Sequence, residues 1–116
     1  MPRVKRGFKA RRRRNKVLKQ AKGYRGGHSK LFRTAQESVD KGLTYAYVGR
    51  RLKKRDARSL WIQRIGAAAE GLGLSYSKLM GGLKKAKIAL DRKVLAFLAA
   101  EDPSVFARIV DAAKKA

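Results

Sequence analysis

The sequence predicts an all-α protein in which a long basic helical N-terminal extension is joined to a small compact helical bundle. Three observations support this prediction. Proline occurs only at Pro2 and Pro103, and the residues between them are rich in Ala, Leu, Lys, Arg and Gln, which are good helix formers. No stretch alternates Val, Ile, Thr and aromatic residues as a β-strand does. Basic residues are concentrated in the first half, and apolar residues at helical spacing in the second.

The first helix is expected over residues 9–21, after irregular chain over residues 1–8. Basic residues surround this helix on every side, and its apolar members are few. They are Val17, Leu18 and Ala21. Three of the five residues at positions 23–27 are glycine, which favours a turn after the helix.

A second, long helix is expected to begin with Ser29 as its N-cap. Gly42 and Gly49 weaken it by about 1 kcal/mol each relative to Ala, so that it either kinks or breaks into two helices. A helix unbroken over residues 29–71 would be about 65 Å long at 1.5 Å per residue. Its apolar stripe consists of Leu31, Phe32, Ala35 and Val39.

From about residue 57 onward the apolar spacing predicts a packed domain of four short helices. Gly-Leu-Gly at positions 71–73 ends the first of them. Ser75 and Asp91 can cap the next two, and Asp102 with Pro103 can begin the last. The residues expected to face the core are Leu60, Trp61, Ile62, Ile65, Ala68, Leu72, Tyr76, Leu79, Met80, Leu83, Val94, Leu95, Leu98, Val105, Phe106, Ile109, Val110 and Ala113. We expect Trp61 to be the main anchor of this core.

Positive charge is spread very unevenly along the chain. Residues 1–33 contain fourteen Lys or Arg and no Asp or Glu. Residues 1–60 contain twenty-one basic and three acidic residues, a net charge of +18, whereas residues 61–116 contain ten basic and five acidic residues, a net +5. Such self-repulsion requires a dense polyanion as a partner, and nucleic acid is the commonest one in a cell. We therefore expect residues 1–58 to form a basic helical arm that binds nucleic acid and residues 59–116 a globular helical domain.

The placement of the basic residues favours structured RNA over linear DNA. A helix that is basic on every side suits folded RNA, whose phosphates approach from several directions, whereas one face of a duplex needs a single basic stripe. The run at residues 50–58 has six basic residues in nine and is expected to bind phosphate rather than serve only as a solvated face. The candidate RNA-binding residues are Lys5, Arg6, Lys9, Arg11, Arg12, Arg13, Arg14, Lys16, Lys19, Lys22, Tyr24, Arg25, His28, Lys30, Arg33, Arg50, Arg51, Lys53, Lys54, Arg55, Arg58, Lys84, Lys85, Arg92 and Lys93.

Aromatic residues are interleaved with this charge, and aromatic rings beside Arg can stack on unpaired bases. Tyr24, which lies among glycines, is expected to contact RNA, whereas Phe32 is expected to pack. The glycines at 23, 26 and 27 either form a plain turn or let backbone amides approach a phosphate closely. His28 is the only histidine and is expected to contact phosphate or base, or simply to be exposed.

Several classes of function are not supported by the sequence. With no Cys, one His and eight scattered carboxylates, we expect no metal site and no catalytic role for His28. No phosphate-binding GxxxxGK[ST] loop occurs. No apolar run approaches the roughly 20 residues that span a bilayer, and the arm has too few large apolar residues to insert as a membrane-active helix. The arginine-rich start also has the composition of an organelle transit peptide, but the basic region extends much further.

A collinear set of short motifs covers essentially the whole chain and resembles the twentieth-numbered protein family of the bacterial large ribosomal subunit. The motifs are Pro2-Arg3-Val4-Lys5-Arg6-Gly7, Lys16-Val17-Leu18-Lys19, Ala21-Lys22-Gly23-Tyr24-Arg25-Gly26, Tyr45-Ala46-Tyr47, Lys54-Arg55-Asp56, Leu60-Trp61-Ile62, Leu74-Ser75-Tyr76-Ser77, Gly82-Leu83-Lys84-Lys85-Ala86 and Asp91-Arg92-Lys93-Val94-Leu95. Each motif alone is weakly specific. Their order and spacing together are a strong signal for this family.

The resemblance implies a non-enzymatic, cytoplasmic ribonucleoprotein component that has no cofactor, binds large-subunit ribosomal RNA directly and promotes early subunit assembly. Residues 1–58 would then be an RNA-threading arm, and residues 59–116 a globular domain that binds RNA and protein. Its implied partners are that RNA and neighbouring large-subunit proteins, without a membrane and without homo-oligomer formation. In several members the protein also represses translation of its own operon, which makes its own messenger RNA a further candidate partner. A chromosome-compacting protein that uses the same charge on duplex DNA is the alternative, although no apolar wedge motif is recognisable.

Overall fold

The computed structural model describes residues 1–116 and is all-α, as predicted, with five α-helices, one 3₁₀ turn and no strand. The elements are α1 (Lys9–Gln20), the 3₁₀ turn (Gly26–His28), α2 (Phe32–Gly71), α3 (Tyr76–Lys85), α4 (Arg92–Glu101) and α5 (Pro103–Lys115). The chain forms two compact units, Met1–Arg51 and Leu52–Ala116, and α2 contributes to both. The functional division expected after residue 58 stays a prediction.

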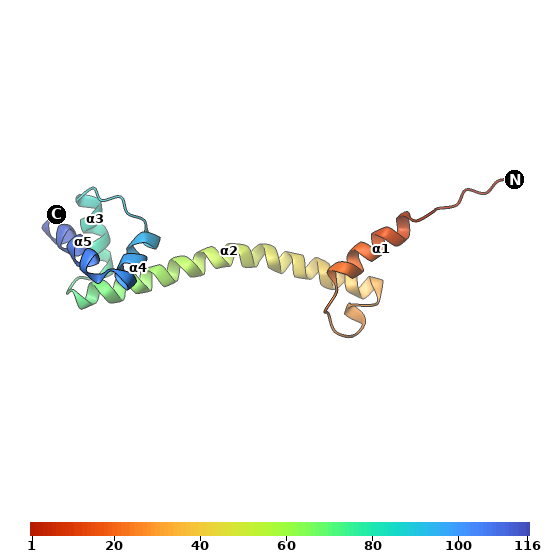
Figure 1. Ribbon diagram of the computed structural model, residues 1–116, viewed down its shortest axis with the longest axis horizontal. Helices are drawn as coiled ribbons and strands as arrows, with labels where there is room; N and C mark the ends of the chain where they lie inside the picture. The colour runs from red at the N-terminus through yellow and green to blue at the C-terminus, as the bar shows by residue number, and fades with distance from the viewer. The chain divides into compact units, whose positions relative to one another are not determined.

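A small apolar cluster holds the first unit together. Ala21, Ala35 and Val39 are buried in it, and Val17 and Leu18 of α1 pack against them. Figure 1 shows α1 beside the beginning of α2, with the intervening loop turning the chain back. Because the buried side chains are small, burial stabilises this unit far less than a full core would.

The prediction that Ser29 caps the second helix is wrong. The helix begins three residues later, at Phe32, and Ser29 instead follows the 3₁₀ turn. The hydroxyl of Ser29 donates a hydrogen bond to the carbonyl oxygen of Gly26 over 3.1 Å. Gly23 and Gly26 have φ angles of 88° and 60°, a backbone region that a side chain disfavours, so the glycines are needed to make the turn.

Helix α2 continues without a break through both Gly42 and Gly49. Gly42 provides room for a neighbour, because a Cβ placed there would lie 3.1 Å from the hydroxyl oxygen of Tyr24. A Cβ on Gly49 would have no such neighbour within 4 Å. The predicted apolar stripe is confirmed at Ala35 and Val39, which are buried. It is wrong at Leu31, whose side chain is 63% exposed.

In the second unit, helices α3, α4 and α5 gather around the C-terminal end of α2 (Figure 1). Helix α5 packs against both α3 and α4. The core is built from all four helices, and its largest fully buried side chains are Ile65, Leu79, Leu95, Phe106 and Val110. All five were among the predicted core residues.

Helix ends in the second unit follow local chemistry. Helix α2 ends in a Schellman motif, in which the amide of Gly73 (φ 76°) donates to the carbonyl of Glu70 and the amide of Leu74 donates to that of Ala69. The Asp91 carboxylate accepts a 2.7 Å hydrogen bond from the Val94 amide and so caps α4 as predicted.

Ser75 and Asp102 occupy the predicted N-cap positions of α3 and α5, but neither side chain makes a capping hydrogen bond. Helix α5 begins at Pro103, as predicted. Proline is favourable in the first turn because the backbone N–H that it lacks would have no partner within the helix.

Sequence periodicity misplaced several core residues. Trp61 is only partly buried against the core, so it is not the main anchor, and Phe106 is the largest fully buried side chain. Helical spacing identifies a face, but it does not say how far along that face the neighbouring helices extend. The predicted core residues found exposed are Leu60, Leu72, Val94 and Val105. The buried residues that were missed are Ala69 and Ala96.

Candidate nucleic-acid interface

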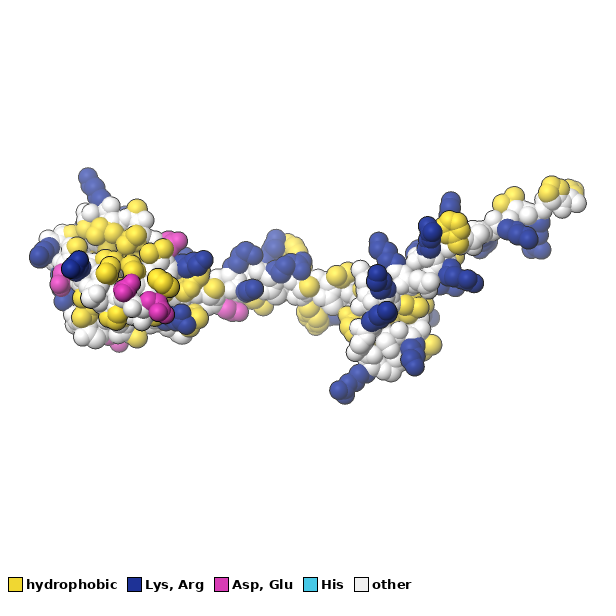
Figure 2. Space-filling model, viewed as in Figure 1, with side chains coloured by type: hydrophobic (Ala, Val, Ile, Leu, Met, Phe, Trp, Pro, Cys, Tyr) yellow, Lys and Arg dark blue, Asp and Glu magenta, His cyan; other side chains and the backbone are white.

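The first unit presents basic side chains on several sides of its helices. Helix α1 contains seven Lys or Arg among its 12 residues, and none of its residues is buried (Figure 2). Residues 1–51 contain seventeen basic and only two acidic residues. The predicted binding residues of this unit that are exposed are Lys5, Arg6, Lys9, Arg11, Arg12, Arg13, Arg14, Lys16, Lys19, Lys22, Tyr24, Arg25, His28, Lys30, Arg33, Arg50 and Arg51.

Four cations in this unit lie over aromatic rings, an arrangement that the sequence did not reveal. The closest pair places the Arg51 guanidinium carbon 3.9 Å from the centre of the Tyr47 ring. The same distance is 4.2 Å for Arg12 over Phe8. The other pairs are Lys41 over Tyr45 and Arg14 over Phe32.

Stacking holds a cation in place while it remains exposed. A guanidinium lying flat on a ring keeps its N–H donors at its edge, in an orientation that suits a phosphate. Tyr45 and Tyr47 are 64% and 52% exposed, so their rings are also accessible to an unpaired base. Phe32, which was expected to pack, is half-buried and carries a cation on its ring.

His28 braces the turn region against the beginning of α2. Its Nδ1 lies 2.5 Å from the hydroxyl oxygen of Ser38. The hydroxyl of Ser38 donates its one hydrogen to the carbonyl oxygen of Thr34 over 2.9 Å. The Ser38 oxygen therefore accepts the hydrogen bond from His28, which places a hydrogen on Nδ1. A role for the exposed His28 in RNA contact stays a prediction.

The basic run at residues 50–58 lies entirely on α2 and is exposed at each of its basic positions. Arg50 and Arg51 belong to the first unit, whereas Lys53, Lys54, Arg55 and Arg58 belong to the second. Consecutive helical residues are about 100° apart, so these side chains point around α2 rather than along one stripe. Their contact with phosphate stays a prediction.

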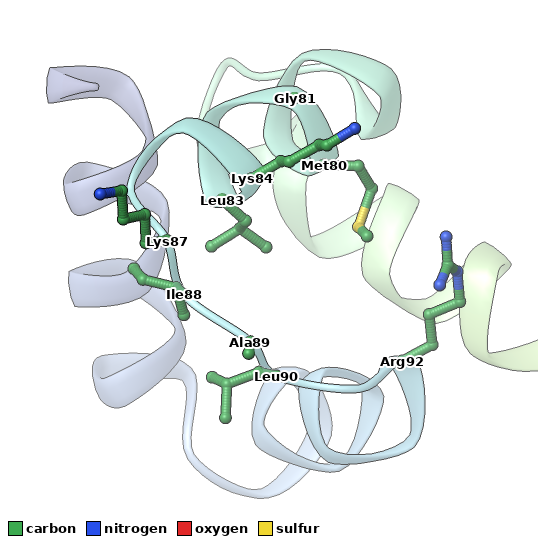
Figure 3. Close-up of a pocket in the computed structure, with 9 residues that line it drawn as sticks. All are labelled: Met80, Gly81, Leu83, Lys84, Lys87, Ile88, Ala89, Leu90 and Arg92. Carbon is green, nitrogen blue, oxygen red and sulfur yellow. The ribbon is translucent and has the colours of Figure 1, made fainter.

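In the second unit the structure brings two of the predicted residues together around a cavity of about 580 Å³. Lys84 at the end of α3 and Arg92 at the start of α4 both line it, although they are eight positions apart in the sequence (Figure 3). Lys87, which the sequence analysis missed, is a third cation at this cavity. The other lining residues are Met80, Gly81, Leu83, Ile88, Ala89 and Leu90.

Lys85 and Lys93, the other two predicted residues beyond α2, do not line this cavity. Lys85 borders a separate hollow between α3 and α5, where Lys78 and Lys114 also lie. Lys93 is exposed on the first turn of α4. The Lys114 ammonium donates a 2.9 Å hydrogen bond to the carbonyl oxygen of Leu72, so this lysine helps to fasten α5 to the end of α2.

No group of three or more His, Cys, Asp or Glu side chains is placed to hold a metal ion. No helix combines the length and the apolar character needed to span a membrane.

Comparison with known proteins gives a consistent result over nearly the whole chain. Residues 3–109 match the family model described as ribosomal protein L20. The chain is 69% identical to the large ribosomal subunit protein bL20 of Syntrophotalea carbinolica over 114 residues, which cover 98% of this chain and 97% of that protein. The proteins of the same name from Geotalea daltonii and Geobacter metallireducens are 68% and 67% identical over the same coverage.

Proposed function

Because the chain belongs to the ribosomal protein L20 family, we propose that it binds large-subunit ribosomal RNA directly and helps this RNA to fold during early subunit assembly. It is a structural protein of the large ribosomal subunit, and hence a component of the cytoplasmic ribosome and of translation. Its role is binding rather than catalysis, and neighbouring large-subunit proteins are its further partners.

The observation that carries this proposal is the exposure of basic side chains on several sides of the first unit, with two acidic residues among fifty-one. Each Lys or Arg that neutralises a phosphate releases condensed counterions from the RNA. The affinity of the protein for RNA should therefore fall steeply as the salt concentration rises. RNA in turn removes the repulsion among these side chains. Binding and ordering of the RNA around the basic helices are therefore coupled.

The test is a competition assay with the full-length chain at two salt concentrations. Labelled large-subunit ribosomal RNA competes with equal masses of duplex DNA and of an unrelated structured RNA. We expect the ribosomal RNA to be preferred at the higher salt, where contacts that depend on charge alone are weakened. Equal competition by all three nucleic acids would overturn the proposal and favour an architectural DNA-binding protein.

A further inference from the structure

The cavity between the end of α3 and the start of α4 combines an apolar lining with a cationic edge. Met80, Leu83, Ile88 and Leu90 provide apolar side chains, and no acidic residue lines it. Figure 3 shows Lys84, Lys87 and Arg92 extending outward on different sides of this apolar group. The volume of about 580 Å³ is within the range of small-molecule binding sites. An occupant that matches this lining has an apolar part and negative charge beside it.

Arg92 is held in position rather than left to move in solvent. Its Nε donates a 2.9 Å hydrogen bond to the hydroxyl oxygen of Tyr76, which lies in the first turn of α3. The positive end of the α4 dipole adds to the charge of Arg92 and Lys93 there, and cations are disfavoured at that end of a helix. Asp91, the adjacent acid, has its carboxylate on the Val94 amide. The positive potential at this edge of the cavity suits an anion.

Lys87 has a backbone conformation that its side chain makes unfavourable. It is the only non-glycine residue with a positive φ, at 56°. It occupies the left-handed position of a Schellman motif, since its amide donates to the Lys84 carbonyl and the Ile88 amide donates to that of Leu83. The same motif at the end of α2 has Gly73 at the corresponding position. A lysine therefore occupies a position that favours glycine, and its side chain lies at the cavity edge, which motivates a functional hypothesis for it.

We propose that this cavity receives one unpaired nucleobase of an RNA strand, with the phosphates on either side of that base contacting Lys84, Lys87 and Arg92. The proposal rests on the proposed RNA-binding function and adds a defined base site to it. Proteins that take a base out of the stack hold it between aromatic or apolar side chains, and basic grooves bind the phosphates of single strands. An apolar side chain of a partner protein is the competing occupant, but it would leave three cations at the edge without anionic partners.

The first test is a nuclear magnetic resonance titration of the full-length chain, observing the methyl groups of Met80, Leu83, Ile88, Ala89 and Leu90. The probes are RNA octamers of adenylate and of uridylate, and an abasic octamer with the same number of phosphates. We expect at least one base-bearing octamer to shift these methyl signals, and the abasic octamer to shift them much less. An apolar hexapeptide is titrated in parallel. Equal shifts from all octamers, no shift from any octamer, or shifts caused only by the peptide would overturn the proposal.

The second test blocks the cavity. Ala89→Trp adds a large side chain at an exposed loop position, and Gly81→Leu adds one where nothing lies within 4 Å of a Cβ. The second change also removes a glycine from a helix, so it is expected to fold well. Both variants are expected to lose the base-dependent methyl shifts and to bind large-subunit ribosomal RNA about tenfold more weakly.

Ala100→Trp is the matched control, because Ala100 is exposed on α4 and does not line this cavity. It is expected to retain both the shifts and the affinity. If the wild-type chain prefers ribosomal RNA but the blocked variants bind it equally well, the base site is wrong and the proposed function stands. The octamer titration does not depend on that preference, so it tests the base site even if the proposed function fails.

Discussion

Gly82 and Ala113 bring α3 and α5 into direct backbone contact. A Cβ on Gly82 would overlap the carbonyl oxygen of Ala113 and would lie 2.9 Å from its carbonyl carbon. Both residues lie in helices, so neither backbone can move without disturbing its own hydrogen bonds. The lack of a side chain at Gly82 therefore determines how closely these two helices pack.

Replacing Gly82 with Ala is expected to lower the free energy of unfolding by about 1–3 kcal/mol, because the new methyl group forces α3 and α5 apart. Thermal unfolding followed by circular dichroism measures this loss. Gly81→Ala is the matched control, since its Cβ would meet nothing within 4 Å. The control is expected to gain about 0.5–1 kcal/mol from better helix propensity. Equal effects of the two changes would contradict the packing argument.

Phe106→Ala is expected to cost about 3–5 kcal/mol, because it removes the largest fully buried side chain and leaves a cavity among four helices. That is a large fraction of the stability of a small domain. Denaturant unfolding of the full-length chain provides the measurement. Phe97→Ala removes the same side chain where it is 60% exposed, and it should change stability by about 0.5 kcal/mol or less.

Asp91→Ala should destabilise α4 by about 1 kcal/mol, because the amide of Val94 loses the carboxylate that caps it. Ser75→Ala changes the equivalent position of α3, where the side chain makes no capping bond, and is expected to cost less. Amide hydrogen exchange in the first turns of the two helices resolves the difference. Similar losses of protection in both variants would argue against a specific role for the Asp91 cap.

Lys87 is expected to show opposite effects on stability and on RNA binding. Lys87→Gly relieves the positive φ and should raise the free energy of unfolding by about 1 kcal/mol while weakening RNA binding. Lys87→Ala removes the ammonium but keeps the strained backbone, so it should weaken binding without that gain. The two variants together separate the conformation of the backbone from the charge of the side chain. Unchanged RNA affinity in both would exclude Lys87 from the interface.

The four consecutive arginines of α1, Arg11–Arg14, are expected to contribute to the salt dependence of RNA binding. Changing all four to Gln should reduce the slope of log affinity against log salt by about 3, since each phosphate contact contributes about 0.7–0.9. Changing the same four to Lys keeps the charge and should keep most of the slope. A slope unaffected by the Gln substitutions would show that α1 does not contact phosphate. The measurement is a filter-binding titration of large-subunit ribosomal RNA across salt concentrations.

Local chemistry explains why much of the fold was predictable. The glycine-rich turn after α1, the Gly73 terminus of α2, the Asp91 cap and Pro103 at the start of α5 each act within a few residues. Ser29 was misread because its residue type favours a helix start, whereas its hydroxyl bonds back to Gly26 in the 3₁₀ turn and α2 begins only at Phe32. The prediction of burial was correct at the centre of each apolar face and wrong toward the ends of that face, as at the exposed Leu72.

Helix propensity, motif order and composition are properties of the chain, so the all-α class, the family and the concentration of positive charge in the first half were predictable without a structure. The fold, rather than the sequence pattern, places Lys84, Lys87 and Arg92 at one cavity, because the turn between α3 and α4 brings together residues that helical spacing alone does not relate. It also decided which glycines matter for packing. The sequence treats Gly81 and Gly82 alike, and only the position of Ala113 on a distant helix distinguishes them.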